Sequence, residues 1–154
     1  MSVHRFSITQ LLPLSLEEAW EFFSTPRNLT RITPPEMNFR ILTPDLPDET
    51  YAGQIIAYTL TPVAGIRSGW ITEITHVKAP HFFVDEQRKG PYRMWHHQHH
   101  FRAHKSGTEM TDIVHYEIPL GKLGDALNAL YIRNRIHGIF EHRRKVLEQL
   151  FPQK

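Results

Sequence analysis

The chain has 154 residues, 40% of them hydrophobic and 22% charged, with a formal net charge of +2 and no cysteine. This length suits a single domain, residues 1–154, the missing cysteines exclude disulfides and thiolate chemistry, and the small charge gives no argument for nucleic-acid binding. No apolar run is long enough to span a membrane and the N-terminus lacks a signal-peptide core, so we expect a cytoplasmic protein without stable membrane insertion.

The N-terminal part of the chain predicts one strand and two short helices. Apolar and polar residues alternate over residues 3–12, as in a strand. Ser15 and Glu18 have the spacing of a capping box, in which each side chain bonds the backbone N–H of the other residue, and a short amphipathic helix follows. A second short helix is expected from Pro26, and it must end before Pro34.

Residues 37–119 consist of segments with strand character, separated by turns that are rich in proline and glycine. The expected strands cover residues 39–42, 54–60, 67–77, 81–87, about 91–103, and 108–118. Short strands joined by short turns predict an antiparallel meander.

The last thirty residues predict one long helix from Asp125, as its cap, to about Phe151. Apolar residues at helical spacing form a single stripe, with Arg143 in its middle: Ile132, Ile136, Ile139, Phe140, Leu147 and Leu150. A long amphipathic helix is not stable alone, so we expect this stripe to be buried on the concave side of a curved sheet. Three leucines lie off the stripe and are expected to pack against other elements or to form a cavity mouth: Leu123, Leu127 and Leu130.

The segment around residues 91–103 is the most informative part of the chain, because it holds four histidines between two large aromatic residues. In a strand, alternate side chains point to opposite faces. The face with the aromatic residues is the expected inward face: Trp95, His97, His99 and Phe101. We expect His96 and His100, on the other face, to be exposed. A buried imidazole needs partners for both ring nitrogens, so two of them on an inward face indicate a polar-lined cavity.

Asp112 is the expected partner of the inward histidines. It alternates with apolar residues along the strand predicted over 108–118, which marks its face as inward. A buried carboxylate needs a partner, and the histidine strand is its hairpin neighbour. We therefore expect Asp112 to bond to His97 or His99. Whether this network is a satisfied part of the core or a site for ligand contact or proton transfer stays open.

Other residues extend this polar interior. Arg143, on the apolar helix stripe, requires an anion, either Asp85 or Asp112, and we interpret it as a clamp between helix and sheet. On the strand predicted over 81–87, Asp85 and Gln87 are expected to face inward. Aromatic residues such as Trp70 are more often core than ligand lining, although the hydroxyl of Tyr116 could reach a bound oxygen atom.

A metal site is a weaker interpretation of the histidines. Two histidines at alternate positions of a strand lie roughly 6.7 Å apart along it. With a carboxylate, such a pair could bind zinc or iron(II). However, no acidic residue follows the pair before Glu109, and Gly90 is one residue out of the register of a cupin-like metal pattern. We therefore expect no metal and no cofactor.

Several phrases of the chain, taken in order, resemble a known superfamily. They are residues 13–23, 28–34, 83–87 and 90–92, Trp95-x-His97-x-His99-x-Phe101, Thr111-Asp112-x-Val114-x-Tyr116-x-x-Pro119 and Phe140-x-x-Arg143. Together they look like a bacterial branch of the SRPBCC superfamily, which groups START lipid-transfer domains, polyketide cyclases, ring-hydroxylase α-subunit domains and birch-pollen-allergen-like proteins. The resemblance covers essentially the whole chain. It implies the α+β helix-grip fold: a curved antiparallel sheet of about seven strands around a long C-terminal helix, with two short helices after the first strand.

The resemblance also implies a cavity for a hydrophobic ligand, but no single reaction, because this fold hosts many functions. The preferred function is binding or carriage of a small hydrophobic ligand (a lipid, polyketide or aromatic molecule) by a monomer or homodimer. The alternative is a cyclase- or dehydratase-like enzyme, in which His97 or His99 acts as general base oriented by Asp112. If side chains fill the interior, the chain is instead a ligand-free interaction module. The expected ligand-binding residues are Trp70, Trp95, His97, His99, Phe101, Asp112, Tyr116 and Arg143.

Overall fold

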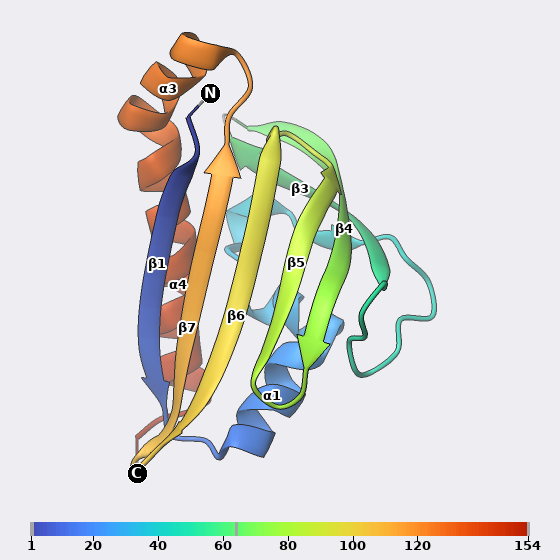
Figure 1. The fold of residues 1–154 in the computed structure, drawn as a ribbon, viewed down its shortest axis with the longest axis vertical. Coiled ribbons are helices and arrows are strands. Elements are labelled where there is room, and N and C mark those ends of the chain that lie inside the picture. Colours follow the sequence, from blue (N-terminus) through green and yellow to red (C-terminus); the bar gives the residue numbers. More distant parts are fainter. Residues whose placement is uncertain (1, 64, 154) are drawn as a thin grey trace.

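The computed structural model describes residues 2–63 and 65–153, in which seven strands form an antiparallel sheet (Figure 1). The strands are β1 (His4–Leu12), β2 (Arg40–Ile41), β3 (Ile55–Val63), β4 (Ile66–Lys78), β5 (Phe82–Lys89), β6 (Met94–His104) and β7 (Gly107–Glu117). Their order across the sheet is β1-β7-β6-β5-β4-β3-β2. The strands from β2 to β7 thus form the predicted meander, and β1 pairs with β7 as the edge strand beyond it.

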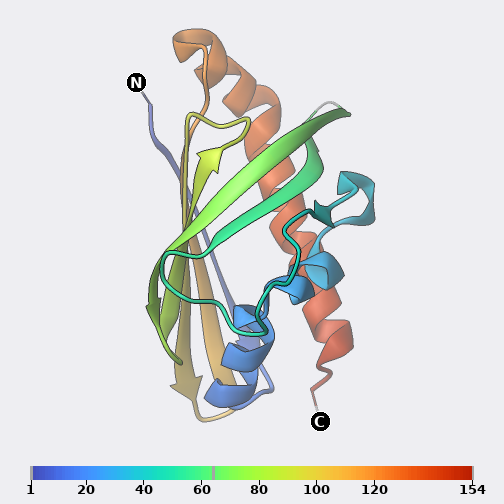
Figure 2. The same cartoon turned by 90° about the vertical axis from the view of Figure 1, so that its right-hand side faces the viewer.

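Short helices follow β1, as predicted. They are α1 (Leu16–Ser24), the 3-10 turn η1 (Pro26–Asn28), α2 (Leu29–Ile32) and the 3-10 turn η2 (Pro35–Met37). The capping box of α1 is confirmed: the Ser15 hydroxyl accepts from the Glu18 N–H at 3.1 Å, and the Ser15 N–H donates to the Glu18 carboxylate at 2.8 Å. This segment lies at one end of the sheet's concave side (Figure 2).

The long C-terminal helix consists of α3 (Gly121–Leu127), a π-helical turn η3 (Asn128–Ile132) and α4 (Arg133–Leu150). The prediction that Asp125 caps it is wrong, because the helix begins at Gly121, after Leu120 in the left-handed region with φ 81°. Asp125 lies inside the helix, where its carboxylate accepts from the Ser2 hydroxyl at 2.9 Å. The two glycines of α3 concealed this first turn from sequence reasoning, since glycine is a poor helix former. Gly124 is required there because a Cβ would collide with the Pro119 carbonyl oxygen.

The apolar stripe of α4 packs against the concave face of the sheet, as predicted (Figure 2). Ile136, Phe140 and Leu147 are all buried. The ring of Phe140 lies 4.8 Å from that of Phe6 on β1, and Leu147 joins a second cluster with residues of α1 and the sheet. Helix and sheet therefore share two apolar contact regions.

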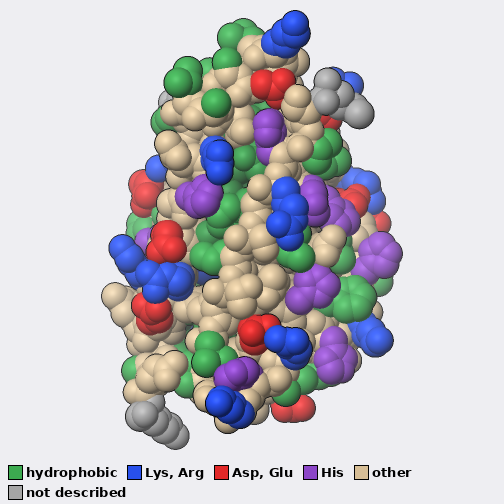
Figure 3. Space-filling model, turned by 60° about the vertical axis from the view of Figure 1, so that its left-hand side comes forward, with side chains coloured by type: hydrophobic (Ala, Val, Ile, Leu, Met, Phe, Trp, Pro, Cys, Tyr) green, Lys and Arg blue, Asp and Glu red, His purple; other side chains and the backbone are tan. Residues whose placement is uncertain are grey.

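The expectation for the three leucines off the stripe is wrong. Leu123, Leu127 and Leu130 are 62%, 41% and 79% exposed, and they do not line the cavity described below. The cause is geometric: α3 extends past the end of the sheet, so it has no neighbouring surface to cover it (Figure 1). Hydrophobic side chains are accordingly visible at the surface over this end of the molecule (Figure 3).

Within the described part of the chain, no helix combines the length and the apolar character that crossing a bilayer requires.

The turn between β6 and β7 depends on Gly107, whose φ is +134°. A Cβ at this position would also collide with the carbonyl oxygen of Leu12. We expect Gly107→Ala to lower the free energy of unfolding by about 1–3 kcal/mol, the usual cost of a strained backbone residue, as measured by urea unfolding. The control is Gly69→Ala, because no heavy atom of the described chain lies within 4 Å of a Cβ built there. Equal losses in the two variants would show that the turn does not need glycine.

Candidate functional site

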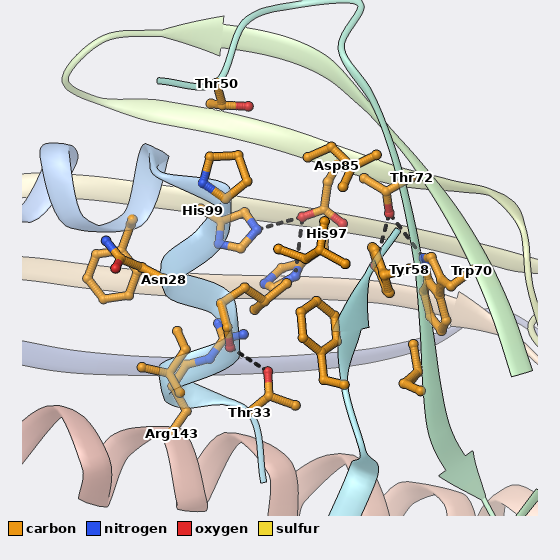
Figure 4. A pocket seen from close by; sticks show the side chains of 18 of the residues that line it. Asn28, Thr33, Thr50, Tyr58, Trp70, Thr72, Asp85, His97, His99 and Arg143 are labelled. Atoms are coloured by element: carbon orange, nitrogen blue, oxygen red, sulfur yellow. Dashed lines mark hydrogen bonds and ion pairs between the residues drawn. The ribbon is translucent and has the colours of Figure 1, made fainter. Parts of the chain in front are cut away.

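A cavity of about 180 Å³ lies between the concave face of the sheet, α4 and the segment from α1 to β2 (Figure 4). Most of its wall is apolar or aromatic, including Met37, Phe39, Ile56, Leu60, Trp70, Ile74, Tyr92, Trp95, Ile136 and Phe140. Its polar end is formed by Asp85, His97, His99 and Arg143. The cavity therefore has an apolar body and one polar end.

The polar end belongs to a buried group of four residues, Asp85, His97, His99 and Asp112, which we call the His–Asp cluster. The strand register places Asp85 opposite His97 and Asp112 opposite His99. Each carboxylate bonds diagonally: His97 Nε2 lies 2.7 Å from Asp112 Oδ1, and His99 Nε2 lies 2.6 Å from Asp85 Oδ2. The centroids of the two imidazole rings are 3.7 Å apart. The predicted bond between Asp112 and an inward histidine is thus confirmed.

The second nitrogen of each imidazole also faces a carboxylate. His97 Nδ1 lies 3.6 Å from Asp85 Oδ2, and His99 Nδ1 lies 3.2 Å from Asp112 Oδ1. The latter contact lacks hydrogen-bond geometry, so His99 Nδ1 is buried without a hydrogen-bond partner among the described residues. Each ring therefore stands between the two carboxylates.

Arg143 brings α4 to this cluster, as Figure 4 shows. Its Nη1 lies 3.5 Å from Asp112 Oδ1, which identifies Asp112 as the anion that the sequence predicted for it. The guanidinium also lies over the ring of Phe140, 4.9 Å from the centroid. Its Nε is buried and has no hydrogen-bond partner among the described residues. Arg143 is therefore a clamp whose buried Nε–H has no acceptor among the described residues.

The environment sets opposite charge states for the two histidines. Burial and the neighbouring His99 lower the pKa of His97 below its ordinary value. Burial also acts to lower the pKa of His99, but the two carboxylates outweigh it and raise this pKa. For Asp85 and Asp112, burial acts to raise the pKa, but the histidines and Arg143 hold it below the usual range. In the folded protein these shifts favour protonation of His99 over His97, beside two ionised carboxylates and the Arg143 guanidinium.

The structure brings together five of the eight expected site residues at the cavity wall: Trp70, Trp95, His97, His99 and Arg143. The other three lie outside the lining. Phe101 packs under α1, with its ring 5.8 Å from that of Trp20. Asp112 stands behind the histidines, and the Tyr116 hydroxyl donates to Asn128 Oδ1 at 2.8 Å, which ties β7 to η3.

The aromatic wall of the cavity also holds two hydroxyl groups that sequence reasoning missed. The hydroxyl of Tyr58 lies 3.1 Å from that of Thr72, and the Trp70 indole N–H donates to the Thr72 hydroxyl at 3.0 Å. Burial and the nearby Asp85 raise the pKa of Tyr58. The alternation of side chains in β4 places Thr72 on the same face as Trp70. This alternation was the sequence signal that could have identified Thr72 as a residue of the cavity.

One further expectation needs correction. His96 and His100 lie on the outer face, as expected, but they are only partly exposed, because outer-face neighbours cover them. His96 Nδ1 lies 2.6 Å from a Glu86 carboxylate oxygen. Gln87 faces the concave side, as expected, opposite Thr72 in the strand register. It does not line the cavity but donates to the Tyr92 carbonyl at 2.6 Å and holds the turn between β5 and β6.

Comparison with known proteins shows the fold. No protein-family model and no curated protein matches the chain. Solved structures that resemble it include ginseng major latex-like protein 151 from Panax ginseng, with 11% identity over 97% of this chain and 98% of that one and a TM-score of 0.70. A protein from Chromobacterium violaceum has 13% identity over 98% and 99% of the two chains and a TM-score of 0.72. A protein from Mycobacterium smegmatis has 18% identity over 97% of this chain and 98% of that one, with a TM-score of 0.65.

These likenesses extend over nearly the whole chain, and at such low identity they establish the architecture. The chain has the helix-grip fold, with a seven-stranded antiparallel sheet, short helices after the first strand and a long C-terminal helix.

Proposed function

We propose that this protein binds or carries a small hydrophobic ligand with one polar end. The observation that supports this proposal is the cavity, which has a mainly apolar body and an end with ionisable side chains at His97, His99, Asp85 and Arg143. Ligand sites are usually concave, mainly apolar and equipped with a few convergent polar groups. The proposed carrier acts in the cytoplasm, as a monomer or homodimer.

The size and lining of the cavity favour a compact aromatic ligand over a long lipid. An engineered apolar cavity of about 150 Å³ binds benzene. The cavity here, of about 180 Å³, suits a molecule of one or two rings. Its aromatic wall includes Trp70, Tyr92 and Trp95. The ring centroid of Trp70 lies 5.7 Å from that of Tyr92 and 5.5 Å from that of Trp95. Such rings favour edge-to-face contacts with another aromatic ring.

The polar end favours a ligand with a hydrogen-bond acceptor. A buried donor without a partner costs about 1–3 kcal/mol, and Arg143 Nε is such a donor. A ligand oxygen that accepts from this N–H recovers that energy on binding. A phenol, carbonyl or carboxylate group supplies the oxygen.

The same geometry favours binding over the cyclase- or dehydratase-like alternative. A general base needs a nitrogen that faces the substrate proton. Both nitrogens of His97 and of His99 face carboxylates instead, at 2.6 to 3.6 Å. The open cavity likewise argues against a ligand-free interaction module, which requires a filled interior.

We expect 2-naphthol to bind wild-type protein and to bind Arg143→Met about 10-fold to 100-fold more weakly, as loss of a hydrogen bond from a charged group implies. Isothermal titration calorimetry and quenching of tryptophan fluorescence measure this affinity. Naphthalene, which has no acceptor oxygen, should bind both proteins alike.

The matched control variant is Arg144→Met, because Arg144 pairs with Glu141 and Glu148 on the outer side of α4. It should keep the wild-type affinity for 2-naphthol. Absence of binding by any one-ring or two-ring aromatic probe to folded wild-type protein would contradict the proposal.

A further inference from the structure

Three potential metal-ligand atoms converge at the polar end of the cavity. They are a carboxylate oxygen of Asp85 and one ring nitrogen each from His97 and His99, all within 4.8 Å of one another. Asp85 Oδ2 lies 2.6 Å from His99 Nε2 and 3.6 Å from His97 Nδ1. We infer that these residues form a binding site for a divalent transition-metal ion of the zinc or iron(II) class.

The spacing of these atoms suits such an ion. Bonds of about 2.0–2.2 Å from zinc to nitrogen and oxygen place tetrahedral ligand atoms roughly 3.2–3.6 Å apart. The separation of Asp85 Oδ2 from His97 Nδ1, 3.6 Å, lies at the upper end of this range, and its separation from His99 Nε2, 2.6 Å, is about 0.6 Å below the range. Small side-chain rotations therefore admit the ion, and the strands that carry the three residues, β5 and β6, need not move.

Asp112 supplies the support that metal-bound histidines require. Each imidazole presents one nitrogen toward Asp85 and the opposite nitrogen toward Asp112, at 2.7 Å for His97 and 3.2 Å for His99. A carboxylate behind a ligating histidine fixes the tautomer and orientation of the ring. Metal on His99 Nε2 requires the proton on Nδ1, the nitrogen that has no hydrogen bond in this structure. Asp112 is the adjacent acceptor for that proton.

The arrangement is that of an open site. Asp85, His97 and His99 all line the cavity, whereas Asp112 stands behind them. Two histidines and one carboxylate leave at least one coordination position for a water molecule or a ligand oxygen, as in catalytic zinc and non-haem iron sites. Arg143 does not compete for the metal's carboxylate, because it pairs with Asp112 at 3.5 Å.

This inference departs from the expectation of no metal. That expectation rested on the absence of an acidic residue shortly after the histidine pair in the chain. In the structure the acidic ligand comes from the neighbouring strand β5, where Asp85 lies directly opposite His97 in the strand register. A ligand set divided between two strands leaves no compact motif in the sequence.

The test is a titration of chelator-treated protein with cobalt(II), whose visible absorption reports coordination by nitrogen and oxygen ligands. We expect one ion per chain in the wild type. Asp112→Asn should weaken binding about 10-fold to 100-fold, as loss of a supporting carboxylate does elsewhere. Asp85→Asn and His99→Gln, which replace a ligating carboxylate and a ligating imidazole by neutral amides, should weaken it more.

A control for outer-face binding is needed, because several histidine side chains lie at the surface (Figure 3). His96→Gln is the matched variant: His96 neighbours His97 on β6 but pairs with Glu86 on the other face. It should bind cobalt(II) as the wild type does. Equal loss in His96→Gln and His99→Gln, or wild-type binding no tighter than that of His99→Gln, would overturn the inference.

A measurement on the wild type covers the case in which cluster variants do not fold. Bound cobalt(II) should shift or broaden the imidazole NMR signals of His97 and His99 and leave that of the exposed His104 unchanged. An effect confined to surface histidines would overturn the inference as well. Both measurements use the metal ion alone, so their outcome does not depend on aromatic-ligand binding.

Discussion

Replacement of Asp112 by alanine is expected to lower the free energy of unfolding by about 3–5 kcal/mol, the usual cost of removing one partner from a buried ion pair. Asp112 is 4% exposed and contacts three groups that are cationic or can become so: His97, His99 and Arg143. Without it, the guanidinium and the His99 imidazole depend on Asp85 alone. Urea unfolding, followed by circular dichroism, measures the loss.

The matched control is Thr111→Ala, one position earlier on β7. The Thr111 side chain faces outward, and its hydroxyl lies 3.0 Å from that of Thr9 in an exposed pair. Its removal should change stability by no more than about 0.5 kcal/mol. The double variant Asp112→Ala with Arg143→Met should be less damaging than the sum of its parts, because it removes both members of one pair. If Asp112→Ala costs no more than Thr111→Ala, the cluster does not hold the helix to the sheet.

A bond between Asp112 and one of the two inward histidines could be predicted because two local signals bring them together. Strand alternation assigns the faces of β6 and β7, and the tight turn ending at Gly107 sets the register of the hairpin. Both signals lie within about twenty residues of sequence. The pairing therefore needed no knowledge of the rest of the fold.

The role of Asp85 could not be predicted in the same way. Its strand carries polar residues on both faces, so alternation alone does not fix its orientation. The pairing of β5 with β4 also contains two irregularities of register, which no sequence pattern predicted. Asp85 reaches the histidines only because β5 pairs with β6 in the register that sets it opposite His97.

The division between cavity and core also depends on tertiary structure. Trp95 and Phe101 share one face of β6, yet Trp95 lines the cavity and Phe101 is covered by α1. Alternation determines the face of a side chain, whereas its position along the strand determines which helix covers it. Tyr116 illustrates the same limit, because η3 covers it through Asn128.

The stability of the protein should also depend strongly on pH, with the largest contribution of the His–Asp cluster near pH 6.5. The folded-state pKa values of Asp85 and Asp112 are lowered, so their contributions are present above an unfolded pKa of about 3.9 and are lost as pH falls through the folded values. The lowered pKa of His97 acts in the same direction, because the unfolded chain takes up this proton first as pH falls below about 6.5.

The raised pKa of His99 acts in the opposite direction. Its contribution is complete below about pH 6.5 and is lost as pH rises through the folded-state value. Urea unfolding across this pH range, with a chelator present to exclude metal, should therefore show a maximum near neutrality and a steep acid limb. Asp112→Asn should flatten the acid limb and His99→Gln the alkaline one, while Thr111→Ala should retain the wild-type profile. An acid limb as steep in Asp112→Asn as in the wild type would show that groups other than Asp112 produce it, since any group whose pKa is lower in the folded than in the unfolded state gives such a slope.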